Sequence, residues 1–193
     1  MRGDYINRVR DYLHRTPVAT IGSISALLPS REYAYVVMNH LLKRGEVKKI
    51  TRGYYTVHED PSLLVYCLKP AYLGLQDAMS LHNLWEQETN PIIITARKVR
   101  QGVRVVLGQN VWIRRISPKY FFGYDHISSG EFHFPVSDVE KTMIDMVYFR
   151  EIKEDAIEKF KNRIDRGKLE KYLKKYGRRF REKFSRILKV SGI

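Results

Sequence analysis

Residues 45–61 read GEVKKITRGYYTVHEDP, and this stretch decides the fold. Residues that favour strands fill 46–50 and 54–57, and the segment between them contains a glycine, which favours a tight turn. The stretch therefore predicts a β-hairpin whose strands cover 46–50 and 54–57. Its cations are Lys48, Lys49 and Arg52.

Three short helices are predicted before the hairpin. Apolar residues at helical spacing indicate the first over residues 4–14. Thr20 can cap a second over 21–28, and Ser30 can cap a third over roughly 31–44. Three short helices followed by a hairpin is the order of a winged helix-turn-helix. The buried stripe of the third helix is predicted to be Ala34, Val37, Met38 and Leu41.

The outward face of the third helix would enter the major groove of DNA in such a fold. Arginine can bind guanine there and asparagine can bind adenine, whereas the hairpin cations would meet phosphates. The alternatives are an ordinary solvated helix face and lysines that protect an exposed strand edge. The predicted DNA contacts are Arg31, Tyr35, Asn39 and Lys43 on the helix, with Lys48, Lys49 and Arg52 on the hairpin.

The chain after residue 61 alternates between helical and strand-forming segments. The sequence therefore predicts an α+β protein, with a winged helix-turn-helix over 1–58 and a mixed α/β domain over 59–193 that ends in helices. The predicted strands cover 71–75, 91–96, 103–107, 111–117, 120–124 and 131–136. The predicted helices cover 61–69 and 76–85, begin again at Ser137 or Asp138, and cover 154–189 with breaks at Gly167 and Gly177.

The formal charge of +14 is concentrated at the two ends of the chain. Residues 1–57 have ten Lys or Arg against four Asp or Glu, residues 58–149 have nine against ten, and residues 150–193 have sixteen against seven. This excess favours a polyanionic partner, nucleic acid first. The tail cations could form a second nucleic-acid surface, or face water on helices whose apolar stripe is buried. They are Lys174, Lys175, Arg178, Arg179 and Arg181.

Disulfide bonding, membrane spanning and catalysis are not expected. Cys67 is the only cysteine, so a reducing cytoplasm is the expected compartment. No apolar run approaches the length of about 20 residues that spans a membrane. Glu140, Lys141, Thr142 and Asp145 predict the capped start of a helix rather than a catalytic site. A phosphate loop, a serine-nucleophile motif and a metal-ligand spacing are also missing, so no cofactor, metal or enzyme activity is predicted.

Three segments resemble the AbiEi-like antitoxins of the abortive-infection type IV toxin–antitoxin systems. They are LLKRGEVKKITRGYYTV (41–57), YLGLQDAMSLHNLW (72–85) and VSDVEKTMIDMV (136–147). Glu140, Lys141, Thr142 and Asp145 are in register with a motif of that family, whereas Asn83 stands where the family usually has glycine. The resemblance covers nearly the whole chain and rests on the set of segments, because no single one is diagnostic.

The resemblance implies a repressor that binds double-stranded DNA repeats in its own promoter, and a second domain that counters a nucleotidyltransferase-like toxin without a stable complex. Two alternatives from other classes stay open at this point. One is a nuclease or nucleotidyltransferase targeted by a winged helix, which would need a set of acidic metal ligands. The other is a transcriptional regulator whose C-terminal half senses a small ligand.

Overall fold

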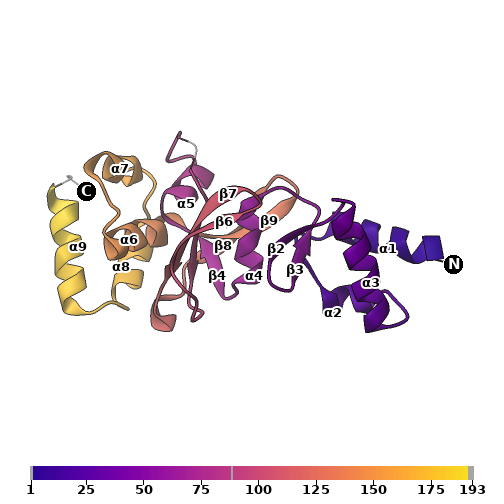
Figure 1. The fold of residues 1–193 in the computed structure, drawn as a ribbon. Helices are drawn as coiled ribbons and strands as arrows, with labels where there is room; N and C mark the ends of the chain where they lie inside the picture. The colour runs from indigo at the N-terminus through magenta and orange to yellow at the C-terminus, as the bar shows by residue number, and fades with distance from the viewer. Residues whose placement is uncertain (1, 88, 191–193) are drawn as a thin grey trace.

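The computed structural model describes residues 2–87 and 89–190 and shows an elongated molecule with three parts in a row (Figure 1). A helical unit with a small sheet forms the N-terminal end, a six-stranded sheet lies in the middle, and helices form the C-terminal end. The protein is therefore of the α+β class, as predicted. Within these residues no helix is both long enough and apolar enough to cross a lipid bilayer.

The second and third helices of the N-terminal unit begin at the capping residues that the sequence predicted. The Thr20 side chain accepts a hydrogen bond from the Ser23 amide at 3.1 Å, and the Ser30 side chain accepts one from the Tyr33 amide at 3.2 Å. Its strands form an antiparallel sheet in the order β1-β3-β2. The elements are α1 (Arg2–Arg15), β1 (Ala19–Thr20), α2 (Ile21–Ser25), α3 (Arg31–Lys43), β2 (Lys48–Thr51) and β3 (Tyr54–Thr56).

The core of this unit fixes the orientation of α3. All four residues of the predicted stripe are buried, and they pack in one cluster with Val9 and Leu13 of α1 and with Ile24 of α2. Full burial of such an aliphatic side chain stabilises a fold by about 1.5–3 kcal/mol. The stripe therefore holds α3 with its polar side turned away from the core.

The hairpin β2–β3 is packed on both faces. Tyr55 contacts the N-terminal core, whereas Tyr54 and Ile50 join a second cluster that contains Leu63 and Leu64. Side chains alternate between the two faces of a strand, so neighbouring tyrosines of β3 serve two different cores. Hydrophobic contacts therefore cross the predicted domain boundary at residue 58.

The middle sheet has six strands in the order β6-β7-β5-β4-β9-β8. The pairs β4–β9 and β5–β7 are parallel, and the other neighbours are antiparallel. Central strand β5 packs Ile93 into the cluster on one face and Ile94 into the cluster on the other. The strands are β4 (Ala71–Leu73), β5 (Ile92–Thr95), β6 (Gly102–Val106), β7 (Gln109–Arg115), β8 (Tyr124–Ser129) and β9 (Phe132–Ser137).

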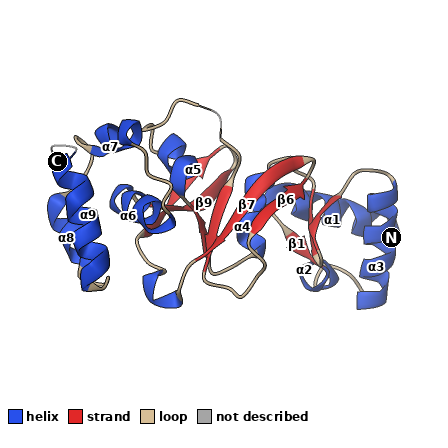
Figure 2. Cartoon of the chain, turned by 60° about the vertical axis from the view of Figure 1, so that its left-hand side comes forward, coloured by secondary structure: helices blue, strands red, loops and turns tan. Residues whose placement is uncertain are grey.

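Helices cover both faces of this sheet (Figure 2). One face packs against α5 (Leu75–Leu81) and α6 (Val139–Phe149). The other packs against a 3₁₀ turn (Pro61–Leu63) and α4 (Leu64–Cys67), which lie next to the N-terminal unit. Three further helices pack on α6: α7 (Glu154–Phe160), α8 (Arg166–Leu173) and α9 (Arg178–Val190).

Two predictions about secondary structure were wrong. Residues 120–123 do not belong to a strand, because a 3₁₀ turn (Pro118–Tyr120) and a loop bring Tyr120 onto the ring of Tyr176 at 4.2 Å between centroids, and Tyr124 is the first residue of β8. Gly167 lies inside α8 instead of breaking a helix. The break comes just before α8, where Asp165 caps the helix; the predicted break at Gly177 is confirmed.

Candidate nucleic-acid interface

The outward face of α3 carries all four helix residues predicted to contact DNA. Arg31, Tyr35, Asn39 and Lys43 are exposed. They follow one another at intervals of four residues, which places them along one side of a helix. The buried stripe holds the opposite side against the core, so the structure brings these four side chains together on one free surface.

The first turn of α3 also presents a carboxylate on this surface. Glu32 is exposed, and hydrogen bonds from its own amide and from the Ser30 hydroxyl hold the pKa of its carboxyl below the usual range. An acid close to phosphates would oppose binding, but a carboxylate in the major groove can accept a hydrogen bond from cytosine. The face therefore combines groups suited to base edges rather than cations alone.

The hairpin cations are not equivalent. Lys49 and Arg52 are exposed, whereas Lys48 forms an ion pair with Glu59 just beyond β3. The hydrogen bond from Lys48 lowers the pKa of the Glu59 carboxyl. Lys48 is therefore already neutralised by a partner that a phosphate would have to displace.

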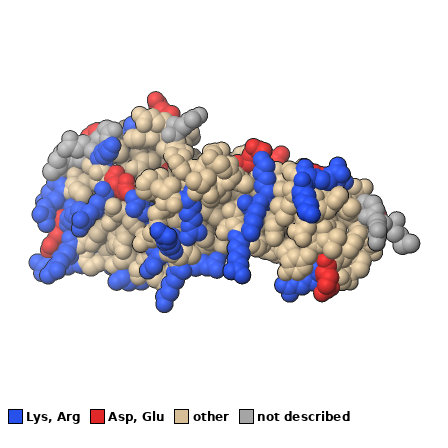
Figure 3. Space-filling model, viewed as in Figure 1, with Lys and Arg blue, Asp and Glu red and all other residues tan. Residues whose placement is uncertain are grey.

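The surface of the middle part is more basic than its sequence suggests. Residues 58–149 contain ten acids and nine cations, but the fold buries four of the acids and, among the described residues, a single cation, Lys141. Burial also raises the pKa of Asp77 to about 7, so this carboxyl keeps only part of its charge at neutral pH. Figure 3 shows Lys and Arg side chains across the middle of the molecule as well as at its ends. The buried acids are Asp77, Asp138, Glu140 and Asp145.

The segment predicted to be a capped helix start is a buried ionic network. The predicted cap is confirmed, since the Asp138 carboxylate accepts the Lys141 amide at 2.8 Å. Lys141 and Asp145 also form an ion pair with side chains 0% exposed. The Tyr72 hydroxyl donates to Asp145 at 2.7 Å, and the Lys141 ammonium donates to the Tyr176 hydroxyl at 3.3 Å. Loss of solvent lowers the pKa of Lys141 and raises that of Asp145, although their mutual attraction acts in the opposite direction.

The same helix start holds α8 against α6 and the middle sheet. Lys168 lies 3.1 Å from both Asp138 and Glu140. Its pKa is raised by hydrogen bonds to these carboxylates, although its partial burial acts against the charged form. The Tyr172 hydroxyl donates to Asp138 at 2.8 Å. These long-range contacts give the segment a structural role that links α6, α8 and the sheet.

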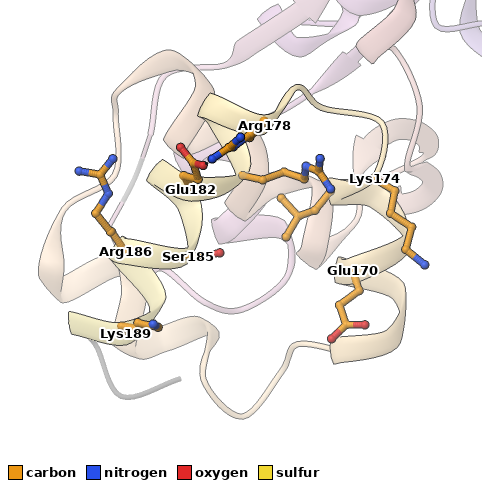
Figure 4. A pocket seen from close by; sticks show the side chains of 9 residues that line it. Glu170, Lys174, Arg178, Glu182, Ser185, Arg186 and Lys189 are labelled. Atoms are coloured by element: carbon orange, nitrogen blue, oxygen red, sulfur yellow. The ribbon is translucent and has the colours of Figure 1, made fainter.

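The predicted second surface is divided by the structure. Lys174, Arg178 and Arg181 line a groove of about 700 Å³ between α8 and α9, whereas Lys175 lies over the Phe122 ring at 3.8 Å. Arg179 is exposed but does not line this groove. Two further cations that were not predicted also line this groove, Arg186 and Lys189 (Figure 4).

Two acids moderate the charge of this groove. Glu170 lies on α8, and Glu182 on α9 accepts a hydrogen bond from Arg178 at 2.7 Å. The helical spacing of α9 contained the signal for Arg186, because it follows Arg178 and Glu182 on the same side of the helix. Among the described residues, no group of three or more His, Cys, Asp or Glu could hold a metal ion.

The comparisons with known proteins bear on the fold alone. Neither a family model nor a curated protein matches this chain. The chain is similar in structure to the RV2827C protein from Mycobacterium tuberculosis, with a TM-score of 0.64 at 13% sequence identity. The similarity covers 98% of this chain and 78% of that one, so the arrangement of the three parts is shared with another protein over almost the whole of this chain.

Proposed function

We propose that this protein is a DNA-binding repressor of its own promoter and the antitoxin of a type IV toxin–antitoxin system. The proposal rests on two supports. One is the resemblance of three sequence segments to AbiEi-like antitoxins. The other is the N-terminal unit, whose element order and exposed α3 face suit a winged helix-turn-helix that binds DNA.

The outward face of α3 is the observation that carries the proposal. Its exposed Arg31, Asn39 and Lys43 are side-chain types that bind base edges or phosphates. A helix of ordinary diameter fits the major groove, which is about 12 Å wide. Lys49 and Arg52 on the adjoining hairpin would bind the phosphate backbone and so set register and affinity.

Separate substitutions in α3 and in the hairpin test this division. Asn39→Ala should cost about 1–3 kcal/mol on the protein's own promoter and little on unrelated DNA, because a base contact is sequence-specific. The double variant Lys49→Ala, Arg52→Ala should lower the affinity for both DNAs by the same factor, because phosphates carry no sequence information. Gel-shift titrations with the two DNAs measure both effects. Equal losses on both DNAs for every variant would show that α3 does not bind base edges.

The Asn39→Ala variant also separates repression from protection. The resemblance places antitoxin activity in the second domain, so the full-length variant should still protect cells that express the cognate toxin. Growth after co-expression measures protection, and a promoter–reporter fusion measures repression. Loss of both activities in a correctly folded variant would mean that protection acts through DNA. A full-length variant is preferable to a truncated protein, because cutting the chain near residue 60 would expose the apolar side chains of Ile50 and Tyr54.

Replacing Glu59 by glutamine should strengthen DNA binding. The change releases Lys48 from its ion pair, and one additional phosphate contact would steepen the plot of log affinity against log salt by about 0.9. Anisotropy titrations at four or more salt concentrations give this slope. Glu158→Gln on α7 is the control, since it removes the same charge from an exposed position far along the chain. Equal slopes for the two variants would assign any gain to net charge instead of Lys48.

A further inference from the structure

Val36 is a large apolar side chain on the outward face of α3 and is 62% exposed. The helix buries its apolar stripe on the other side, and the exposed residues at helical spacing from Val36 are Glu32, Asn39 and His40. Valine is also a poorer helix former than the lysine or glutamate that would suit a solvated position. Single exposed apolar residues are common on proteins, so it is the location of Val36 among groups suited to base edges that distinguishes it.

Helix geometry places Val36 beside Asn39. Residues three apart on a helix have Cβ atoms about 5–6 Å apart. Successive bases along one strand of DNA are about 3.4 Å apart. The two side chains would therefore reach bases no more than about two positions apart.

The major groove offers one apolar group, the methyl group on C5 of thymine, and asparagine suits the N6 and N7 edge of adenine. We infer that Val36 contacts the methyl group of a thymine that lies within about two base pairs of an adenine bound by Asn39. This inference rests on the proposed DNA-binding function and names the sequence feature that α3 selects. Val36 is thus a specificity-determining residue, and its contribution depends on a single methyl group.

Deoxyuridine tests the contact directly, because it differs from thymidine only by the absence of that methyl group. The probes are duplexes that the full-length protein enriches from a random-sequence library, with each thymine replaced singly by deoxyuridine. Replacement at one position should lower the affinity of the protein for the duplex about fourfold, which corresponds to ~0.8 kcal/mol for one buried methyl-sized group. Val36→Ala should lose a similar factor on the thymine duplex and nothing further on the deoxyuridine duplex.

Val105→Ala is the matched control. It makes the same change at a valine that is 72% exposed on β6, remote from α3 in sequence and in the fold. This variant should bind both duplexes like the unchanged protein. A second probe replaces adenines by 7-deazaadenine, which lacks the N7 acceptor. At one adenine this replacement should weaken binding of the unchanged protein but not of Asn39→Ala. That adenine should lie within about two base pairs of the thymine at which deoxyuridine weakens binding.

Several results would overturn the inference. Val36→Ala could bind both duplexes as tightly as the unchanged protein, or lose the same factor on both. If Asn39→Ala still discriminated between enriched and unrelated DNA in either case, the proposed function would stand and the methyl contact would not. If the full-length protein enriched no sequence and bound no DNA, the proposed function and this inference would fail together.

Discussion

Asp145→Ala should destabilise the protein by about 3–5 kcal/mol, because it leaves the ammonium group of Lys141 buried without its ionic partner. Lys141 and Asp145 have no exposed side-chain surface, so water cannot replace the missing carboxylate. The hydroxyl of Tyr72 loses its acceptor in the same change. Urea unfolding followed by circular dichroism measures the loss. The double variant Lys141→Met, Asp145→Leu should recover part of it, since apolar replacements of buried ion pairs are often neutral or stabilising, while the Tyr72 hydroxyl still lacks its acceptor.

The pH dependence of Asp145→Ala has a defined sign. Burial already lowers the pKa of Lys141 in the unchanged protein, and removing Asp145 takes away an attraction that raises it. The unfolded chain then binds a proton that the folded chain releases, so the variant regains stability as pH rises towards the ordinary lysine pKa. Glu182→Ala is the control, because Arg178 and Glu182 form a pair at the same i,i+4 spacing on the surface. A loss in Asp145→Ala no larger than in this control would contradict the buried-pair account.

Binding to promoter DNA should weaken by about 10³–10⁵-fold between 50 and 200 mM salt if six to ten phosphates are contacted. The net charge of +14 makes such a set of phosphate-binding groups available. The physical cause is the release of counterions when Lys and Arg neutralise phosphates. A gel-shift series at fixed pH measures the slope, and binding that is absent or independent of salt would remove the winged-helix proposal.

The same series decides whether the second surface predicted on the C-terminal helices belongs to the interface. Neutralising Lys174, Lys175, Arg178, Arg179 and Arg181 should reduce the slope by about 0.9 for every phosphate that the variant no longer binds. Folding should survive, because the buried Tyr176 and Phe184 are untouched and surface changes usually shift stability by about 0.5 kcal/mol or less. An unchanged slope with promoter binding intact would leave these cations as a solvated helix surface.

The three N-terminal helices and the hairpin could be predicted because their signals are local, whereas the two-residue strand β1 was not predicted. A capping hydroxyl such as that of Ser30, and an apolar stripe such as that of α3, act within one or two helical turns. The outward positions of Arg31 and Asn39 followed from the same periodicity. Strand β8 was not predicted, because its alternation is weak: most of its residues are exposed and Ile127 alone is partly buried.

The buried network could not be predicted, because its partners are distant in sequence. Tyr72 and Asp145 are separated by 73 residues, and neither neighbourhood contains a signal for the other. Lys48 illustrates the same limit at short range. Its charge was evident, but its ion pair with Glu59 depends on where the chain leaves β3. The basic surface of the middle part was hidden because residue counts do not distinguish buried acids from exposed ones.

The two faces of β3 have a consequence for how this protein can evolve. Tyr55 packs against the core of the N-terminal unit, and the adjacent Tyr54 packs against the core between the hairpin and the middle sheet. A DNA-binding unit joined by a free linker can be exchanged between proteins as a module. Here an exchange would open both cores at once, so under the proposed DNA-binding function a new specificity is more accessible through point changes on α3 than through recombination of whole domains.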